Sequence, residues 1–473
     1  MHTKGLRKTK IIATLGPATS SPEMLGALID AGVNIFRLNM SHAPHDWVRR
    51  IVTDIRAASS ARGKFTGIMM DTQGPAIRTG DLSVPLNLQP GQKFTLTVRG
   101  ERSEEEHSVD VNYANFVNDI NVGDTVLFDN GAIQMKVLAK DGNKVQCEVL
   151  TEGVLGSRRH INLLGVRVSL PALTVKDIAD VKLGLEVGVD LVALSFVREA
   201  RDLLQLKELL SSDAKERPLV IAKIEDQQAV KNLEEIVAEA DGVMVARGDL
   251  GIEIPYEERP IVQRRIVKAC LRVGKPVIVA THMLESMIES PMPTRAEVTD
   301  VANAVYEQAD AIMLSGETTV GKYPLKCIEV FDRIAERTER SGGANFFEHA
   351  ELTQARQKVV KSAIVMANEL KAEAILVFTR NGSMARFTGW LRPRYSQIFA
   401  VCSRAEVARG LSLNWGVCPV VVPFDLINPE NTIEGALQTL TEQGRLKTGQ
   451  TVVVIGAILV ADKIVDAVQM RVV

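Results

Sequence analysis

Residues 219–225 read Leu-Val-Ile-Ala-Lys-Ile-Glu, and residues 242–249 read Gly-Val-Met-Val-Ala-Arg-Gly-Asp. Each stretch is a short apolar run that ends in charged or polar residues, and a helix-length amphipathic segment follows it. This alternation predicts parallel strands joined by helical crossovers. Six more runs of the same kind occur at residues 10–16, 34–41, 67–73, 191–197, 276–283 and 311–318. Together the eight units predict a (β/α)8 barrel.

The composition is that of an ordinary folded protein. The chain has 473 residues, of which 46% are hydrophobic and 24% charged, and its formal net charge of −2 offers no general attraction for nucleic acid or anionic lipid. Its longest apolar stretch, 451–461, is far shorter than the roughly 20 residues that span a bilayer. The five cysteines are scattered without metal-ligand spacing, so we expect a reduced, cytoplasmic protein.

Two further domains are expected around the barrel. Residues 74–170 interrupt the alternation after the third strand and alternate at period two around glycine-containing turns, which predicts an inserted β-barrel lid domain. After Gly343 a new strand–helix alternation predicts a doubly wound α/β domain. The fold class is therefore α/β: a (β/α)8 TIM barrel (1–73 and 171–342), an all-β lid (74–170) and a C-terminal α/β domain for regulation or assembly (343–473).

Barrels of this class carry their chemistry at the C-terminal ends of the strands. Lys223 and Glu225 stand two residues apart, hence on one face of an apolar strand, and Asp249 ends the next run. One interpretation is a buried structural ion pair. The functional one makes Lys223 a cation or a Schiff-base amine and makes Glu225 and Asp249 ligands of Mg²⁺ or Mn²⁺.

A second polar group closes the neighbouring runs. Asn39, Ser41, Asp71 and Thr72 offer hard oxygen ligands beside Arg37, which suits a cation next to a bound anion, although rim hydrogen bonding explains them equally. Arg37 and Arg78 are candidates to clamp phosphate.

Nine motifs, in order within residues 10–324, resemble the pyruvate kinase family. They are ATLGPAT, FRLNMSH, DTQGPAIRTG, INLLGVRVSLPALTVKD, IAKIED, VARGDLGIEIP, ATHMLESM, PTRAEVTDVANAV and MLSGET. The resemblance implies phosphoryl transfer from phosphoenolpyruvate to ADP, giving ATP and an enolate that is protonated to pyruvate, the last step of glycolysis. It also implies a homotetramer.

The resemblance also implies roles for individual positions. Lys223 would stabilise the transferring phosphoryl group, Arg37 would contact it, and Glu225 and Asp249 would hold Mg²⁺. Thr281 would lie near the methylene carbon during protonation. The remaining expected site residues are Asn39, Ser41, Asp71 and Thr72 for K⁺, Pro17, His42, Arg78, Lys182 and Gly248 for substrate or nucleotide, and Ser315 and Glu317 for a water relay.

Departures from the family pattern leave two properties open. Gln73 and Ala76 replace residues that accompany K⁺ dependence, so this dependence is undecided. Residues 379–385 only partly match the phosphate loop of a sugar-phosphate effector pocket, and 458–466 lacks the second effector loop. Candidate contacts for a sugar-phosphate or AMP effector are Thr379, Asn381, Gly382 and Ser383.

Two other functions compete with this one. A barrel lyase or aldolase would use Lys223 to form a Schiff base with pyruvate, which borohydride would trap. A regulatory subunit would bind ADP or a sugar phosphate without turnover. The carboxylates beside Lys223 favour metal-assisted enolate chemistry over both alternatives.

Overall fold

Eight parallel strands close into a barrel in the computed structural model, in the order β1-β16-β15-β14-β13-β12-β3-β2. The strands are β1 (Lys10–Thr14), β2 (Ile35–Asn39), β3 (Gly67–Asp71), β12 (Leu191–Leu194), β13 (Leu219–Ile224), β14 (Gly242–Ala246), β15 (Val277–Ala280) and β16 (Ala311–Leu314). The structure describes residues 7–99, 105, 107–129, 131–166, 168–211, 217–425, 427–460 and 463–473. All eight predicted barrel strands are therefore found, and the predicted (β/α)8 barrel is confirmed.

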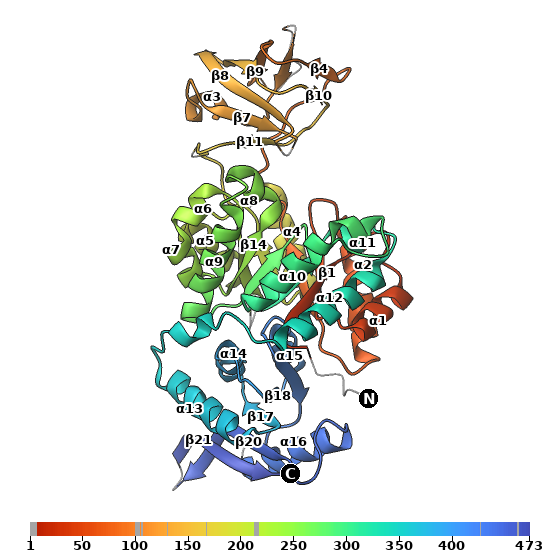
Figure 1. The fold of residues 1–473 in the computed structure, drawn as a ribbon, viewed down its shortest axis with the longest axis vertical. Coiled ribbons are helices and arrows are strands. Elements are labelled where there is room, and N and C mark those ends of the chain that lie inside the picture. Colours follow the sequence, from red (N-terminus) through yellow and green to blue (C-terminus); the bar gives the residue numbers. More distant parts are fainter. Residues whose placement is uncertain are drawn as a thin grey trace.

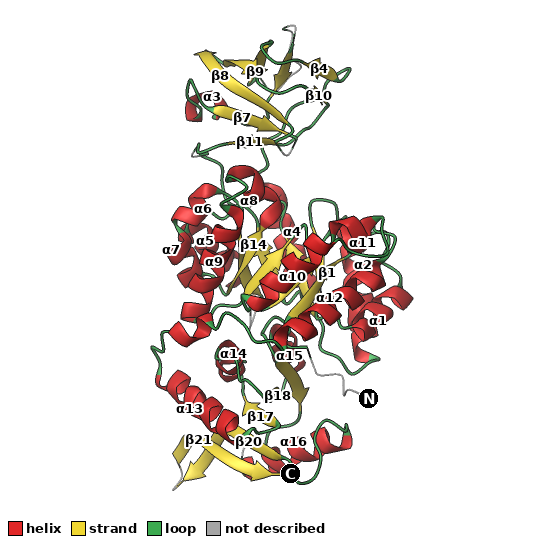
Figure 2. Ribbon diagram, viewed as in Figure 1, coloured by secondary structure: helices red, strands yellow, loops and turns green. Residues whose placement is uncertain are grey.

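Helices pack around the barrel (Figure 2), and α1, α4 and α10 begin at side-chain caps. Thr174 and Asp177 form a capping box at the start of α4, and Thr294 and Glu297 form another at α10. The outer helices are α1 (Pro22–Ala31), α2 (His45–Ser60), α4 (Val175–Val187), α5 (Ala200–Ser211), α7 (Leu233–Glu239), α9 (Arg259–Val273), α10 (Arg295–Tyr306) and α12 (Pro324–Glu339). Short helices follow the strand ends directly: α6 (Gln227–Lys231), α8 (Arg247–Glu253), η1 (Glu285–Ile288) and α11 (Gly316–Thr319).

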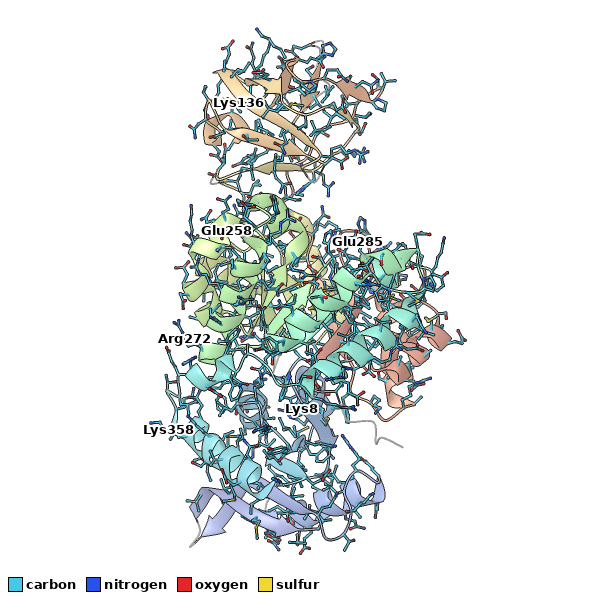
Figure 3. The ribbon with its side chains drawn as sticks, in the orientation of Figure 1. Lys8, Lys136, Glu258, Arg272, Glu285 and Lys358 are labelled. Carbon is cyan, nitrogen blue, oxygen red and sulfur yellow. The ribbon has the colours of Figure 1, made fainter. Side chains whose placement is uncertain are left out.

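The C-terminal domain completes the lower end of the barrel interior. Leu413 is fully buried within the barrel's inner cluster, together with residues such as Ile12 and Met69. Gly67, at the start of β3, has room for this segment only because it lacks a side chain, since a Cβ there would lie 2.3 Å from Ser412 Oγ. Lys8 lies at the same junction (Figure 3), with its ammonium 4.9 Å from the centre of the Trp415 ring. The two domains therefore share one core.

The segment between β3 and α4 folds as a separate all-β lid at one end of the molecule (Figure 1). A six-stranded sheet has the order β11-β7-β8-β9-β5-β6, and β10 pairs with β4 in a separate sheet. The elements are β4 (Leu86–Leu88), β5 (Lys93–Thr97), β6 (Ser108–Asp110), α3 (Phe116–Asp119), β7 (Thr125–Phe128), β8 (Ile133–Asp141), β9 (Lys144–Val149), β10 (Gly153–Leu155) and β11 (Ile161–Leu163). The turn predicted at Asn130 lies outside the described residues.

The main sheet of the lid has two edge strands, and the β-barrel expected for this domain stays a prediction. Its edge strands, β11 and β6, are three residues long and do not pair with each other among the described residues. Arg78 bridges to His160 beside one edge and Thr79 to Val111 beside the other. Residues 77–80 also form backbone hydrogen bonds to both sides: the Thr79 amide donates to the Arg159 carbonyl at 2.9 Å, and the Gly80 amide donates to the Asp110 carbonyl at 2.7 Å. The segment 77–80 therefore connects the two edges of the lid sheet.

The C-terminal domain is a five-stranded sheet at the opposite end of the molecule (Figure 1), with the order β19-β18-β17-β20-β21. The first four strands are parallel, as the doubly wound prediction requires, whereas β21 pairs antiparallel with β20 and was not predicted. The elements are η2 (Phe346–His349), α13 (Ala355–Leu370), β17 (Ala374–Phe378), α14 (Ser383–Trp390), β18 (Gln397–Cys402), α15 (Ala405–Gly410), β19 (Val417–Val421), α16 (Pro429–Glu442), β20 (Thr451–Val460) and β21 (Lys463–Val472). Among the described helices, none is long and apolar enough to cross a bilayer.

Candidate active site

Lys223 is the centre of a buried polar network at the C-terminal rim. Its ammonium lies 2.8 Å from Glu225 Oε1 and 3.1 Å from Asp71 Oδ1, and it donates a 2.8 Å hydrogen bond to Ser195 Oγ. Burial alone would lower the pKa of Lys223, but the carboxylates of Asp71 and Glu225 outweigh burial and raise it. The lysine is therefore held as a cation, which disfavours its use as the neutral amine that a Schiff base requires.

Asp71 joins this lysine to a second cation. Arg37 Nε donates a 2.6 Å hydrogen bond to Asp71 Oδ2, and an Arg37 terminal nitrogen donates to Thr14 Oγ1 at 3.2 Å. Asp71 is fully buried, which by itself raises its pKa, yet Arg37 and Lys223 bring the pKa below its usual value. Two fixed positive groups thus face the same part of the rim, as an anionic substrate requires.

Glu225 and Asp249, the candidate ligands of a divalent cation, lie close enough to influence each other electrostatically. Burial raises the pKa of Glu225 to about 7 against the pull of Lys223, and the charge of Asp249 raises it further. Bound Mg²⁺ would relieve that repulsion, and Mg²⁺ commonly uses only one or two protein carboxylates. The described residues contain no group of three or more His, Cys, Asp and Glu side chains that could hold a metal, so a two-carboxylate site is the one that fits.

The expected monovalent-cation ligands lie on the neighbouring strands β2 and β3, where Asn39 and Asp71 are directly paired. Their oxygens already have partners: Asn39 Oδ1 accepts from the Ser41 amide at 3.2 Å, and the Thr72 carbonyl accepts from Ser195 Oγ at 2.6 Å. Both Asp71 oxygens contact cationic side chains. The donor set has the oxygen chemistry of a K⁺ site, but a bound ion would share Asp71 with Arg37 and Lys223.

A cavity of about 590 Å³ opens beside Arg37. Predicted residues Pro17, His42, Asn39 and Ser315 line it, and so does Trp47, which the sequence analysis did not identify. Ser315 Oγ is buried here without a hydrogen-bond partner among the described residues. An aromatic side chain beside an unpartnered hydroxyl and an arginine suits a ligand with a planar ring and an anionic group.

The end of β15 carries an unusual backbone. Thr281 and His282 have φ values of 68° and 54°, a left-handed conformation that is costly for side chains with a Cβ. Arg247 stabilises it by donating to the carbonyl oxygens of Ala280, Thr281 and His282. Thr281 Oγ1 in turn accepts the Gly248 amide at 2.8 Å, so the predicted residues of β14 and β15 form one connected unit.

Glu317 is buried beneath the rim, with both carboxylate oxygens engaged. It accepts the Ser315 amide at 2.8 Å and the Leu284 amide at 3.0 Å. These bonds fix the loops after β15 and β16. Glu317 therefore positions Ser315, rather than offering a free carboxylate to a water chain.

Arg78 and Lys182 have different positions. Arg78 lies on the lid beside His160, and its charge, together with burial, lowers the pKa of His160 while Asp249 of the barrel raises it. Arg78 thus lies within electrostatic reach of the rim. Lys182 is exposed on α4 and lines none of the described cavities. Lys176, in the first turn of the same helix, instead reaches the Met40 carbonyl beside Ser41 at 2.6 Å, and the sequence analysis did not identify it.

The contact between lid and barrel contains further residues that were not predicted. Asn162 of β11 donates to Glu253 of α8 at 3.2 Å, whereas Asn162 Oδ1 is buried without a partner among the described residues. Burial raises the pKa of Glu253 to about 7, with contributions from Asp226 and Asp249. Phe196, whose amide donates to Glu225 Oε2 at 2.6 Å, lines the same cavity of about 500 Å³.

The effector residues predicted in the C-terminal domain border a cavity of about 630 Å³. Thr379, Asn381 and Ser383 line it, and Gly382 caps α14 with φ +85°. Arg356, Arg380 and Arg404 also line this cavity, and Thr379 Oγ1 is buried without a partner in the described part of the chain. The second effector segment, 458–466, lies partly outside the described residues.

Comparisons with known proteins point to one family. The family model described as pyruvate kinase, barrel domain, matches residues 6–328, and that of the pyruvate kinase alpha/beta domain matches 357–465. Plastidial pyruvate kinase 2 of Arabidopsis thaliana is 43% identical over 460 residues, which cover 95% of this chain and 78% of that protein. Pyruvate kinase of Geobacillus stearothermophilus is 38% identical over 468 residues, covering 96% and 78%. The crystal structure of a pyruvate kinase from Cryptosporidium parvum superposes with a TM-score of 0.93 at 34% identity, covering 98% of this chain and 96% of that one.

Proposed function

We infer the roles of the rim residues from the premise that this chain belongs to the pyruvate kinase family. The protein is a kinase that transfers the phosphoryl group of phosphoenolpyruvate to ADP and yields pyruvate and ATP. Its place as the last step of glycolysis is part of the proposal. The buried network around Lys223 is the observation that supports these roles most strongly.

Lys223 and Arg37 bind and stabilise the phosphoryl group during transfer. Their positive charges face one part of the rim because Asp71 holds them 3.1 Å and 2.6 Å from its two oxygens. Preorganised cations cost little reorganisation as negative charge redistributes in the transition state. Glu225 and Asp249 would hold Mg²⁺ or Mn²⁺, which supplies charge neutralisation for the phosphate and enolate oxygens when bound.

The nucleotide binds in the cavity beside Arg37. Pro17 and His42 line it, Trp47 and Ser315 supply ring and hydroxyl contacts, and Arg78 of the lid neutralises phosphate charge. Gly248 contributes through its amide, which fixes Thr281. Lys182 is exposed on α4, and a contact with a nucleotide phosphate would be made from the surface of this helix.

Protonation of the enolate takes place beside Thr281. The hydroxyl of Thr281 accepts from Gly248 and donates to the Ala280 carbonyl at 2.7 Å, which fixes its lone pairs. Ser315 supplies an unpartnered hydroxyl for a bound water, and Glu317 holds the Ser315 backbone. The chain thereby orients a proton donor and excludes bulk water.

Asn39, Ser41, Asp71 and Thr72 would bind K⁺, because their oxygens converge on two adjacent strands. Gln73 and Ala76 leave the strength of this dependence to experiment. The cavity lined by Thr379 and Ser383 also contains three arginines and two aspartates, and Arg356 is paired with Asp466 at 3.0 Å. Its arginines would bind the phosphate of an effector such as a sugar phosphate or AMP.

The homotetramer is carried over from the family resemblance. The edge strand β21 exposes Met470 and Val472 and pairs on one side only within the described residues, which suits contact with a second copy of the chain. The five cysteines are unpaired, which supports a reducing compartment such as the cytoplasm.

The decisive experiment is lactate dehydrogenase-coupled turnover with phosphoenolpyruvate, ADP and Mg²⁺, with and without K⁺. We expect Lys223→Met to lose about 10³-fold or more in kcat. Lys136→Met, on an exposed lid strand (Figure 3), is the matched control and should keep wild-type turnover. Retained turnover in Lys223→Met would overturn the assigned role, and borohydride-dependent inactivation by pyruvate would favour the Schiff-base alternative.

A further inference from the structure

The lid joins the barrel through two chain segments, and one buried carboxylate holds both. Asp177, in the first turn of α4, is fully buried. Its Oδ1 accepts the amides of Gln73 and Gly74 at 3.0 and 3.2 Å, where the chain leaves the barrel. Its Oδ2 accepts the amide and hydroxyl of Thr174 at 3.0 and 2.6 Å, where the chain has returned.

A buried arginine holds the returning segment at two further points. The terminal nitrogens of Arg198 donate to the carbonyl oxygens of Val168 and Leu170 at 2.6 and 2.9 Å. Arg198 itself is 6% exposed, and its backbone is fixed by Asp202 and Asn232. A planar guanidinium matches two carbonyls two residues apart in a way that a lysine cannot.

These bonds determine where the connection can bend. Residues 168–174 and 73–74 are tied to the barrel, whereas residues 75–76 and 164–166 have no bond to Asp177 or Arg198. Gly165 lies in this second segment with φ +69°. Between the two carbonyls that Arg198 holds, the Ser169 amide donates to Tyr113 Oη at 2.7 Å and to Asp119 Oδ2 at 2.9 Å, so the clamped segment is bonded to the lid as well as to the barrel.

The tied residues 73–74 also contact the buried network around Lys223. Gly74 has φ +71°, and a Cβ there would lie 2.7 Å from the Phe196 ring and 2.9 Å from Ser195 Cβ. Ser195 accepts from Lys223, and the Phe196 amide donates to Glu225. Gly74 is thus packed against the two residues that hold Lys223 and Glu225, which leaves the connection little room to shift at this point.

We propose that Asp177 and Arg198 are positioning residues that act as a two-point clamp on the base of the lid. The clamp restricts the lid to a path that brings Arg78 over the nucleotide cavity. This inference rests on the proposed role of Arg78. Neither residue needs to touch substrate. Both act by increasing the fraction of molecules in which the lid has the correct position over the barrel.

The test compares Asp177→Asn and Arg198→Met with matched controls. Ser21→Ala removes the capping hydroxyl of the barrel helix α1 and leaves every bond of Asp177 and Arg198 in place, so it reports the stability cost of a lost cap alone. Arg201→Met makes the same substitution as Arg198→Met at an exposed position on α5. All variants are made in the full-length enzyme.

Lid placement is read directly by pulsed electron paramagnetic resonance. Spin labels are attached at Lys136→Cys on the lid and Glu258→Cys on the barrel, both exposed and marked in Figure 3, in a Cys418→Ser background. We expect the distance distribution to broaden in both clamp variants and to remain narrow in both controls. Unchanged distributions in the clamp variants would overturn the proposal.

Kinetics separate the clamp from the role of Arg78. We expect the KM for ADP to rise about tenfold in the clamp variants, the KM for phosphoenolpyruvate to change less than about twofold, and Arg198→Lys to recover part of the loss. A broadened distribution with an unchanged KM for ADP would retain the clamp and refute the assignment of Arg78. An equal rise of both KM values, matched by Ser21→Ala, would identify general destabilisation and refute the clamp.

Discussion

Asp71→Asn tests whether the buried charges of the site are mutually dependent. The carboxylate of Asp71 lies 2.6 Å from Arg37 Nε and 3.1 Å from Lys223 Nζ and is fully buried. Asparagine keeps the shape and one acceptor but removes the charge that both cations face. Breaking a buried ion pair from one side costs about 3–5 kcal/mol, because the partner charge is left uncompensated. Since Glu225 still faces Lys223 at 2.8 Å, we expect the free energy of unfolding to fall by about 3 kcal/mol.

A double-mutant cycle gives the sharper result. In Asp71→Asn/Lys223→Met, one of the stranded cations is also removed, so the combined loss should be smaller than the sum of the single losses by about 1–3 kcal/mol. The assay is equilibrium urea unfolding by circular dichroism, in EDTA and without K⁺. Because the folded pKa of Asp71 is lowered, its stabilisation is present above its unfolded pKa and is lost only as the pH falls through the folded value.

The difference between wild type and Asp71→Asn should therefore be constant between about pH 6 and 8. A loss below about 1 kcal/mol, or strictly additive single losses, would show that solvent or rearrangement compensates these charges and would refute the reasoning.

Three further changes have defined outcomes. The pKa of Glu253 is raised to about 7, so its ionisation destabilises the folded state increasingly as the pH rises from about 4.5 to 7. Glu253→Gln should therefore raise the melting temperature at pH 8 and leave it unchanged at pH 5. An equal change at both pH values would contradict the raised pKa. The methyl group of Gly74→Ala would clash with Ser195 and Phe196, so the free energy of unfolding should fall by about 2 kcal/mol or more and kcat should fall. Thermal unfolding and turnover at wild-type values would show that there is room for a methyl group here. Arg247→Met removes the donors to the carbonyls of Thr281 and His282, so kcat should fall about 10- to 100-fold with little change in either KM, and a selective rise in KM would place Arg247 in binding instead.

The barrel and its central pair could be predicted from local pattern. Period-two spacing places Lys223 and Glu225 on one face, and the structure brings them to 2.8 Å. The predicted strands extend too far toward their C-terminal ends, because charged residues after an apolar run do not reveal where the backbone turns. Arg247 and Asp249, for example, belong to helix α8 and not to β14. The order of the lid strands and the antiparallel pairing of β21 depend on contacts between distant segments, which periodicity does not encode.

The residues missed at the site share a physical reason. Ser195 and Trp47 are single polar or aromatic residues with no partner at a diagnostic spacing in the sequence. Ser195 joins the network only because barrel closure places β12 beside both β13 and β3. Lys176 and Lys182 lie on the same helix, and only the cap at Thr174 determines which of them faces the rim.

The burial of Leu413 inside the barrel has a consequence for synthesis of the chain. The last barrel strand ends at Leu314, so the ribosome completes all eight strands long before Leu413 emerges. Until then the lower mouth of the nascent barrel exposes the apolar layer that includes Ile12 and Met69. The barrel is therefore completed only after much of the C-terminal domain has been synthesised, and a ribosome stalled before Leu413 emerges would expose this apolar layer to chaperones and proteases.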